Sequence, residues 1–342
     1  MRQIKRAYLI NILLLLVAFF LSFAIGAVPI PLDAILNIFV EQFTQVSIKI
    51  AGAEAFSTIL LQIRLPHTIL ILITGAALGG SGAAYQGLFR NPLADPYLIG
   101  AASGAGLGAI VAMAIQWPSS LFGFYTVPIG AFIGAFLAIA IVYLLAYNNG
   151  SASTSMLILA GVAVGSFATA LTSYLMLRSE GELRRTIAWL LGGSTLSGWD
   201  PVLAAIPYIA LGLGLLVYFS HALNVLQFGE QQAQQLGLPV RRVKSAVIIG
   251  ASLATAAAIS FSGIIGFVGL IIPHSIRFIW GPDHRNLIPL SIIGGASILL
   301  IADLIARRLL APQTLPVGVI TALIGAPFFL WILRRVKDQG GA

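Results

Sequence analysis

Cysteine is absent and charge is scarce in this sequence of 342 residues. Without cysteine there can be no disulfide, thiolate metal site or cysteine nucleophile. Asp, Glu, Lys and Arg together make up 9% of the residues, against about 25% in a soluble domain. Too few polar side chains remain to cover a water-facing surface, which excludes a soluble enzyme, a disordered chain and a nucleic-acid-binding protein.

Hydrophobic residues are abundant instead. They make up 58% of the chain, whose mean hydropathy is +0.98. A helix that crosses a bilayer needs about 20 apolar residues, because its backbone polar groups must be satisfied internally. The sequence therefore predicts an all-α polytopic membrane protein with one transmembrane domain over 1–342. Stretches that lack Asp, Glu, Lys and Arg lie at 7–32, 65–89, 96–177, 201–229, 245–276, 286–302 and 309–333.

The two longest of the middle stretches must be divided. Residues 96–177 contain turn-forming clusters at 116–120 and 148–151, so this stretch should hold three helices. Residues 245–276 have Ser and Gly near their middle and should hold two. The first stretch is too long for a signal-peptide core, so we expect a retained helix there. The ten expected helices lie at 7–28, 64–88, 97–115, 122–146, 155–177, 201–219, 243–260, 264–280, 286–305 and 316–334.

The charged residues predict an orientation. With ten helices both termini lie on the same side, which then holds twelve basic residues, including Arg2, Lys5 and Arg6, and four acidic ones. The other side holds seven of each, so the whole net charge of +8 falls on the side of the termini. Because basic residues gather in cytoplasmic loops, we expect both termini to be cytoplasmic.

Small residues at four-residue spacing predict close helix packing. Helices in lipid gain no hydrophobic free energy from each other, so their association depends on close backbone approach. The segments 64–100 and 242–281 also share a faint pattern, in which an Arg, an Ala/Gly-rich helix and a Pro-containing turn follow one another. Such a pair would run in opposite directions and form an inverted repeat. The glycine series are Gly75 and Gly79; Gly100, Gly104 and Gly108; Gly130 and Gly134; Gly161 and Gly165.

Candidate catalytic and cofactor motifs are few. None of the four lysines follows a glycine, so no P-loop is present, and any ATP that drives this protein must bind to another chain. Ser81 lies in a Gly-Gly-Ser-Gly run that matches the motif of intramembrane serine proteases, with His274 as the one histidine at a suitable depth. A small-residue packing face explains the run more simply. No carboxylate pair or histidine cluster predicts a metal site, so we expect no resident cofactor.

Two loops on the side of the termini have distinctive sequences. Arg-Asn-Pro-Leu-Ala-Asp-Pro at 90–96 is a turn fixed by two prolines, across which Arg90 and Asp95 could pair. The loop of about 220–242 contains a predicted short helix over 230–236, which Gly237 can end in a left-handed cap. Its apolar residues, Ala233, Leu236 and Leu238, could dock on a cytoplasmic partner or pack back on the bundle.

Basic residues on the opposite side are the exception to the charge pattern. Arg64, Arg307 and Arg308 lie there, and Asp303 could pair with Arg307 one helical turn away. A patch of this kind could also bind an acidic partner.

Several of these motifs, in this order, resemble the signature of the FecCD permease family, the membrane subunits of importers for iron–siderophores, haem and cobalamin. The resemblance extends from about residue 60 to the C-terminus. Its motifs lie at 64–66, 75–78, 86–87, 90–96, 100–105, 236–239, 263–270, 273–274, 283–285, 302–303, 315–318 and 325–328.

The resemblance implies a type II ABC importer permease in a bacterial inner membrane. Expected partners are a second copy of the chain with the path between the two copies, two cytoplasmic subunits that bind ATP and Mg, one extracytoplasmic binding protein, and membrane lipid. The same resemblance also implies roles for particular residues. The ATPase should couple to Glu230, Ala233, Gln234, Leu236, Gly237, Leu238 and Pro239, and the cytoplasmic gate should consist of Ser153, Thr154 and Ser155. The binding protein should dock on Arg64, His67 and Arg307, and the structural loop should consist of Arg90, Asn91, Pro92, Asp95 and Pro96.

The residues leave other functions open. A transporter driven by an ion gradient needs carboxylates within the membrane, and Asp303 near one helix end is almost the only candidate. The Ser81 protease and a bare scaffold are further alternatives. The cargo cannot be read from the sequence: Arg178, Arg184 and Arg185 could meet carboxylates or phosphate on it, or pair with Glu180 and Glu182.

Overall fold

The computed structural model describes residues 2–26, 28–31, 33–35, 38, 53–115, 125–148, 151–178, 183–193, 196–311 and 313–340. Over these residues the fold is a bundle of helices. Seven are long and apolar enough to cross a membrane, and three shorter apolar helices accompany them. These ten are α1 (Arg2–Ala24), α4 (Leu65–Leu88), α5 (Ala101–Ala114), α7 (Thr126–Ala146), α8 (Thr154–Arg178), α10 (Asp200–Tyr218), α13 (Val240–Ser262), α14 (Val268–Trp280), α15 (His284–Leu309) and α16 (Val317–Gly340).

Each of these ten helices corresponds to one predicted span, which confirms the all-α polytopic fold. Shorter elements connect them, and of these the sequence predicted α12 alone. The connecting elements are α3 (Ala53–Thr58), the π-helix η1 (Ile59–Arg64), the 3₁₀-helix η2 (Pro96–Ile99), α9 (Leu183–Leu190), α11 (Ser220–Leu226), α12 (Glu230–Gln235), and the antiparallel two-residue strands β1 (Tyr147–Asn148) and β2 (Ser151–Ala152).

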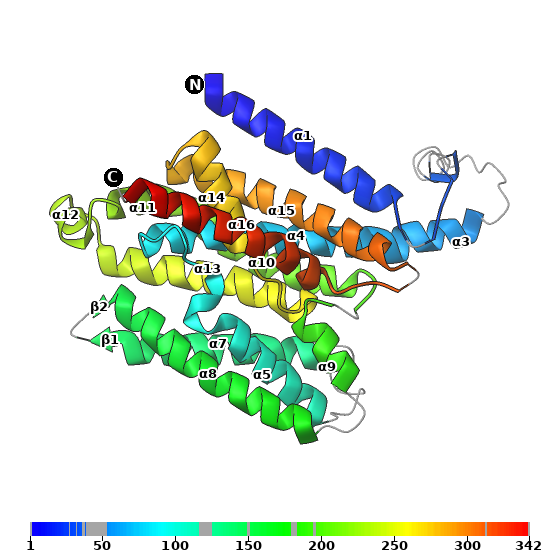
Figure 1. The fold of residues 1–342 in the computed structure, drawn as a ribbon, viewed down its shortest axis with the longest axis horizontal. Helices are drawn as coiled ribbons and strands as arrows, with labels where there is room; N and C mark the ends of the chain where they lie inside the picture. Colours follow the sequence, from blue (N-terminus) through cyan, green and yellow to red (C-terminus); the bar gives the residue numbers. More distant parts are fainter. Residues whose placement is uncertain are drawn as a thin grey trace.

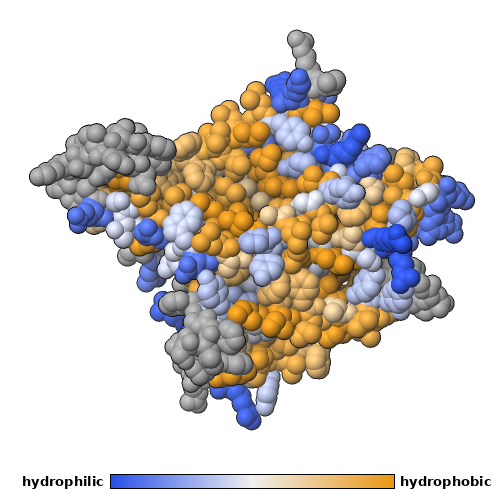
Figure 2. Space-filling model, turned by 180° about the vertical axis from the view of Figure 1, so that it is seen from behind, coloured by the Kyte–Doolittle hydropathy of each residue, from blue (hydrophilic) through white to orange (hydrophobic). Residues whose placement is uncertain are grey.

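The two ends of the bundle carry different elements. Figure 1 shows both chain termini, α12 and the β1–β2 hairpin at one end, and α3 and α9 at the other. We call these the α12 end and the α9 end. Both termini lie at the same end, as an even number of spans requires. Figure 2 shows a face covered mainly by hydrophobic residues, with the most hydrophilic ones near its edges.

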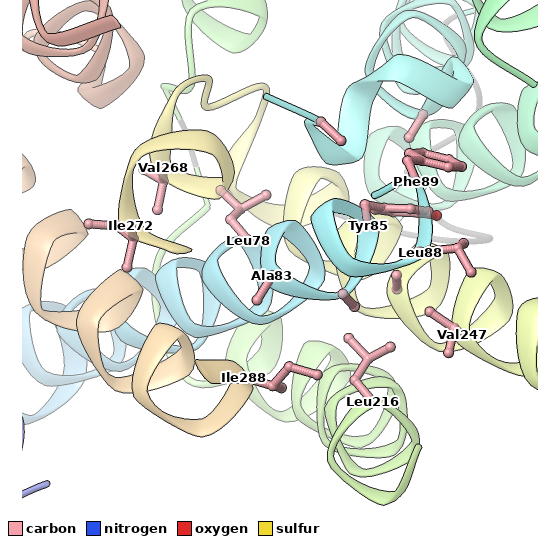
Figure 3. Close-up of a cluster of buried hydrophobic side chains, with 14 of the residues drawn as sticks. Leu78, Ala83, Tyr85, Leu88, Phe89, Leu216, Val247, Val268, Ile272 and Ile288 are labelled. Atoms are coloured by element: carbon pink, nitrogen blue, oxygen red, sulfur yellow. The ribbon is translucent and has the colours of Figure 1, made fainter. Parts of the chain in front are cut away.

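Helix α4 lies at the centre of the bundle. It packs against α10, α13, α14 and α15, and nearly every residue from Thr74 to Leu88 is buried. Figure 3 shows Leu78 of α4 near Val268 and Ile272 of α14, with Ile288 of α15 and Leu216 of α10 on the other side. Neighbouring α4 and α13 run in opposite directions (Figure 1), as the inverted-repeat hypothesis requires.

Glycines on α4 allow this central position. A Cβ added at Gly75 would overlap the carbonyl oxygen of Gly295, and one added at Gly79 would overlap that of Ser291, both on α15. A similar close approach joins α5 to α7, where Gly104 and Gly108 face two glycines of the partner helix. The predicted small-residue packing is therefore present, because side chains at these points would separate the backbones.

The substitution Gly79→Ala tests this packing. We expect it to destabilise the protein by about 1–3 kcal/mol, because α4 and α15 must move apart. The matched control is Gly214→Ala in α10, where an added Cβ meets nothing within 4 Å and alanine favours the helix. Thermal unfolding in detergent measures both variants. Equal unfolding temperatures would contradict the packing argument.

Candidate functional sites

The short helix α12 is a rigid unit closed by its C-terminal cap. Gly237 has φ of +84°, a left-handed conformation that glycine adopts without strain. The Leu238 N–H donates to the Ala233 carbonyl at 3.0 Å and the Gly237 N–H donates to the Gln234 carbonyl at 2.9 Å, which is the Schellman pattern. The predicted helix and its glycine cap are both present.

The apolar residues of α12 divide between two surfaces. Ala233 is fully buried and Leu238 packs against the core, so these two face the bundle. Leu236, however, is 70% exposed and Phe228, just before the helix, is 67% exposed. Of the two alternatives for these apolar residues, packing back on the bundle therefore holds for Ala233 and Leu238. Two large hydrophobic side chains still face outward at the α12 end.

Side-chain bonds fasten this segment to the bundle. Lys244 of α13, itself buried, lies 2.8 Å from Glu230 Oε1. Gln227 Nε2 donates to the Gly87 carbonyl at the end of α4, at 2.9 Å. The preceding helix, α11, is therefore tied to the centre of the fold as well as to α12.

Asn224 of α11 ties the same segment to the start of α15. Its amide nitrogen donates to Asp283 Oδ1 at 2.7 Å, and its oxygen accepts from the His284 backbone N–H at 2.8 Å. His284 Nδ1 lies 2.9 Å from the same oxygen. The side-chain hydrogen bond from Arg285 holds the pKa of Asp283 below its ordinary value, so this N-cap of α15 stays ionised.

The 90–96 loop is an internally bonded turn. Asn91 Oδ1 accepts from the Leu93 N–H at 2.9 Å, and Asp95 Oδ1 accepts from the Tyr97 N–H at 2.8 Å, which caps η2. Burial raises the pKa of Asp95 to about 6, although the Tyr97 hydrogen bond opposes the rise. The expected pair between Arg90 and Asp95, both described, does not form. Pro92 is exposed, while Pro96 begins η2 and is buried.

Tyr97 joins this loop to a second interruption of the helices. Residues 263–267 between α13 and α14 are not helical. The Tyr97 hydroxyl donates to the Ile265 carbonyl at 2.7 Å and accepts from the Ile265 N–H at 3.2 Å. The Tyr97 side chain thus satisfies both the N–H and the carbonyl of Ile265. This matters because non-helical backbone is tolerated at membrane depth only where its hydrogen-bonding groups are satisfied or line a cavity.

A groove of about 710 Å³ adjoins these residues; most of its exposed lining is apolar, and we call it the polar groove after the polar side chains that border it. Asp95 and Tyr97 lie on one side of it, and one face of α8 forms the other. Polar side chains of α5 and α8 thus meet open space in this groove. Its further polar residues are Ser103 of α5 and Ser166, Thr169 and Ser173 of α8.

The residues expected to form the cytoplasmic gate lie at the start of α8. Ser153 Oγ accepts from the Met156 N–H at 3.2 Å, as an N-cap does. Ser153 and Ser155 are exposed and Thr154 is half-buried. They follow the β1–β2 hairpin at the α12 end (Figure 1). Their gating role stays a prediction.

Arg64, expected to dock a binding protein, is buried in the structure. The residue is only 5% exposed. Its guanidinium group donates hydrogen bonds to the carbonyls of Phe23, Ala24 and Val28 at 2.8–3.2 Å. These groups belong to the end of α1 and the chain just after it. The guanidinium therefore satisfies carbonyls that the helix leaves free, and docking through it stays untested.

Arg307 acts on the same helix end. It donates to Ser22 Oγ at 2.8 Å and lies 2.8 Å from Asp303 Oδ2, the predicted pair one turn away. His67 Nε2 lies 3.0 Å from the other oxygen of Asp303. The docking residues Arg64, His67 and Arg307 are thus brought together at the α9 end, but within the protein's own network. Arg308 beside them is exposed.

The remaining outer arginines lie near α9. Arg178, at the end of α8, stacks on Tyr174 with 5.5 Å between the guanidinium carbon and the ring centre. Arg184 is exposed on α9. Glu180 and Glu182, their expected partners, lie outside the described residues.

The proposed protease pair is not assembled. Ser81 is fully buried, and its hydroxyl donates to the Ala251 carbonyl of α13 at 3.1 Å rather than to His274. The packing explanation of the Gly-Gly-Ser-Gly run is the one that the structure supports. Among the described residues no three His, Asp or Glu side chains converge to hold a metal ion, and the expectation of no resident cofactor stays a prediction.

A bundle of apolar helices long enough to cross a membrane, with a short capped helix at one end, has the architecture of a polytopic membrane protein. The chain matches the FecCD transport family over residues 14–335 and belongs to that family. Its relatives include ABC transporter permease YvrB of Bacillus subtilis, 40% identical over 98% of this chain and 95% of that one. Others are the cobalamin import permease BtuC of Halobacterium salinarum, 45% identical over 82% of this chain and 74% of that one, and the hemin transport permease HmuU of Yersinia pestis, 40% identical over 84% and 86%.

Solved structures agree. An inward-facing ABC transporter of the metal-chelate type matches with a TM-score of 0.80 and 30% identity, over 97% of this chain and 99% of that one. A PsaBC complex from Streptococcus pneumoniae matches with a TM-score of 0.55 and 20% identity, over 81% and 94%, and shares the fold. The chain is a transport permease of the ABC importer class.

The substitution Arg64→Gln tests the structural role of this arginine. We expect a loss of about 2–4 kcal/mol of stability, because buried carbonyls at the end of α1 lose their donors. Arg308→Gln is the matched control, since Arg308 is exposed on the same end. Thermal unfolding of the permease without any partner measures both. If the two variants unfold at the same temperature, Arg64 does not hold α1.

Proposed function

We propose that this chain is the membrane subunit of a binding-protein-dependent ABC importer that moves a metal chelate into the cytoplasm. Two separate ATPase subunits supply the energy. The observation that carries the proposal is the α12 unit, which presents Leu236 and Phe228 to solvent from a chain otherwise built for the membrane. Relatives that import cobalamin and hemin support the chemical class of the cargo.

The α12 end is the cytoplasmic end in this proposal. The basic residues that the sequence places on the side of the termini support this orientation, since such residues are retained inside the cell. The permease then spans the bacterial inner membrane many times with both termini inside. The α9 end meets the extracytoplasmic binding protein, through the exposed Arg308 and through Arg64, His67 and Arg307 if their internal bonds exchange.

A second copy of the chain completes the path. Helix α8 lies at the edge of the bundle and is exposed along much of its length, including Leu159, Phe167 and Leu177. The same helix carries the hydroxyl groups of the polar groove. Because polar groups in membrane helices favour a protein interior or an aqueous path, a second copy facing α8 would enclose a translocation route.

An ion-gradient mechanism has less support. Its best carboxylate, Asp303, is paired with both Arg307 and His67 at the α9 end. A carboxylate held by two partners is poorly suited to exchange ions with the path.

Reconstitution tests the proposal directly. The permease, its ATPase and its binding protein are placed in liposomes, and uptake of cyanocobalamin and of hemin is followed with and without internal ATP. We expect uptake of at least one chelate that requires ATP. Accumulation by the permease alone, without the ATPase, would overturn the proposal.

The contact with the ATPase has its own prediction. The double substitution Phe228→Asp and Leu236→Asp places two charges in the proposed interface, and we expect at least a tenfold loss of ATPase co-purification. Leu310→Asp is the control, because Leu310 is also a largely exposed leucine but lies beyond α15 at the α9 end. Normal co-purification of the double variant would show that the ATPase seats elsewhere.

A further inference from the structure

Asn224 of α11 holds the first turn of α15 with both polar atoms of its side-chain amide. Its Oδ1 accepts from the His284 backbone N–H at 2.8 Å, and its Nδ2 donates to Asp283 Oδ1 at 2.7 Å. His284 Nδ1 lies 2.9 Å from the same Asn224 oxygen. Because an amide oxygen only accepts hydrogen bonds, the imidazole donates from Nδ1 in this arrangement. The whole amide group thus faces α15.

The His284 ring also reaches the end of α4. The residue is 2% exposed, and a Cβ added at Gly87 would overlap its Nε2. Nε2 has no hydrogen-bond partner among the described residues, so the ring is oriented by its Nδ1 bond to Asn224 and by the packing around it. A single buried side chain of α15 therefore contacts α4 on one side and α11 on the other. We call Asn224 and His284 the α11 joint.

The α11 joint lies between α12 and the central helices. Helix α11 ends at Leu226 and α12 begins at Glu230, so the connection between them is short. Helix α11 packs against both α4 and α15, whereas α12 packs against α11 and α13. Gln227, in the connection, also donates to the Gly87 carbonyl. A displacement of α12 therefore reaches α4 and α15 by way of α11.

We infer that Asn224 and His284 are positioning residues for energy coupling, which transmit a displacement of α12 to α4 and α15 and have no part in binding the ATPase. The inference rests on the proposed function and names the residues through which that function uses ATP. Close-packed side chains transmit small displacements because little free space remains to absorb them. Without the α11 joint, α12 still seats on the ATPase, but less of its motion reaches α4 and α15.

Proteoliposomes that contain the permease, its ATPase and its binding protein test the inference. The measured quantity is the coupling ratio, which is the cyanocobalamin or hemin taken up per ATP hydrolysed, for whichever chelate the unchanged protein imports. We expect Asn224→Leu and His284→Leu each to lower this ratio about fivefold or more, while ATPase co-purification changes less than twofold. A merely structural role would reduce uptake and hydrolysis in parallel and leave the ratio unchanged.

Three further variants assign the effect to the contact between the two residues. The double leucine variant should have the same ratio as the lower of the single ones, because residues that act through one contact are not additive. His284→Asn keeps a donor near the position of Nδ1, so its ratio should be at least twofold above that of His284→Leu. Tyr8→Phe is the matched control, since it removes a bond from α1 to Asn286 in the same turn of α15, and it should leave the ratio unchanged.

An unchanged ratio in both leucine variants would overturn the inference. So would a double variant whose loss is the product of the single losses, an equal loss in Tyr8→Phe, or a tenfold loss of ATPase co-purification, which would mean that these residues bind the ATPase. If Asn224→Leu does not assemble, His284→Leu carries the test, because it leaves Asn224 bonded to Asp283 and to the backbone N–H of residue 284. Absence of ATP-dependent uptake by the unchanged protein overturns the proposed function as well, whereas uptake with unchanged ratios overturns the inference alone.

Discussion

Direct contact between helix backbones is the constraint on which the rest of this structure depends. Lipid is as apolar as leucine, so helices gain no hydrophobic free energy when they associate through leucine side chains. Neighbouring helices must therefore pack closely against the backbone of α4 to hold it in place. Gly75 and Gly79 of α4 permit this on α15, and Gly82 permits it on α14 at Gly269. Because α4 is fixed by these contacts, the segments at both of its ends are placed as well, and those segments carry Arg64 and the 90–96 loop.

The interruptions of the helices and the polar groove occupy the same region. Tyr97 satisfies the backbone of Ile265, and Asp95 caps the short helix that contains Tyr97. Both side chains also line the groove. Backbone that departs from a helix at membrane depth must have its polar groups satisfied, and the side chain that does so here, Tyr97, also borders the groove. The irregular backbone and the candidate path therefore have one physical origin.

Local signals in the sequence predicted the ten helices and the capped helix α12, because hydrophobic length and a helix-ending glycine depend only on neighbouring residues. Long-range contacts could not be predicted in this way. The partners of Arg64 are about 40 residues away, and Ile265 is 168 residues from Tyr97. The charge pattern placed Arg64 on the side opposite the termini and suggested a surface cation. Only the position of the end of α1 shows that Arg64 bonds to carbonyls of its own chain.

The contacts of α12 indicate how its displacement by a bound ATPase would be transmitted to the membrane-spanning helices. The helix itself touches the bundle mainly through Ala233 and the Glu230–Lys244 pair. Its neighbour α11 is bound more firmly, through Gln227 to the end of α4 and through Asn224 to the start of α15. Displacement of α12 would therefore act on α4 and α15 together. Since those two helices are packed glycine against backbone, they would move as one body.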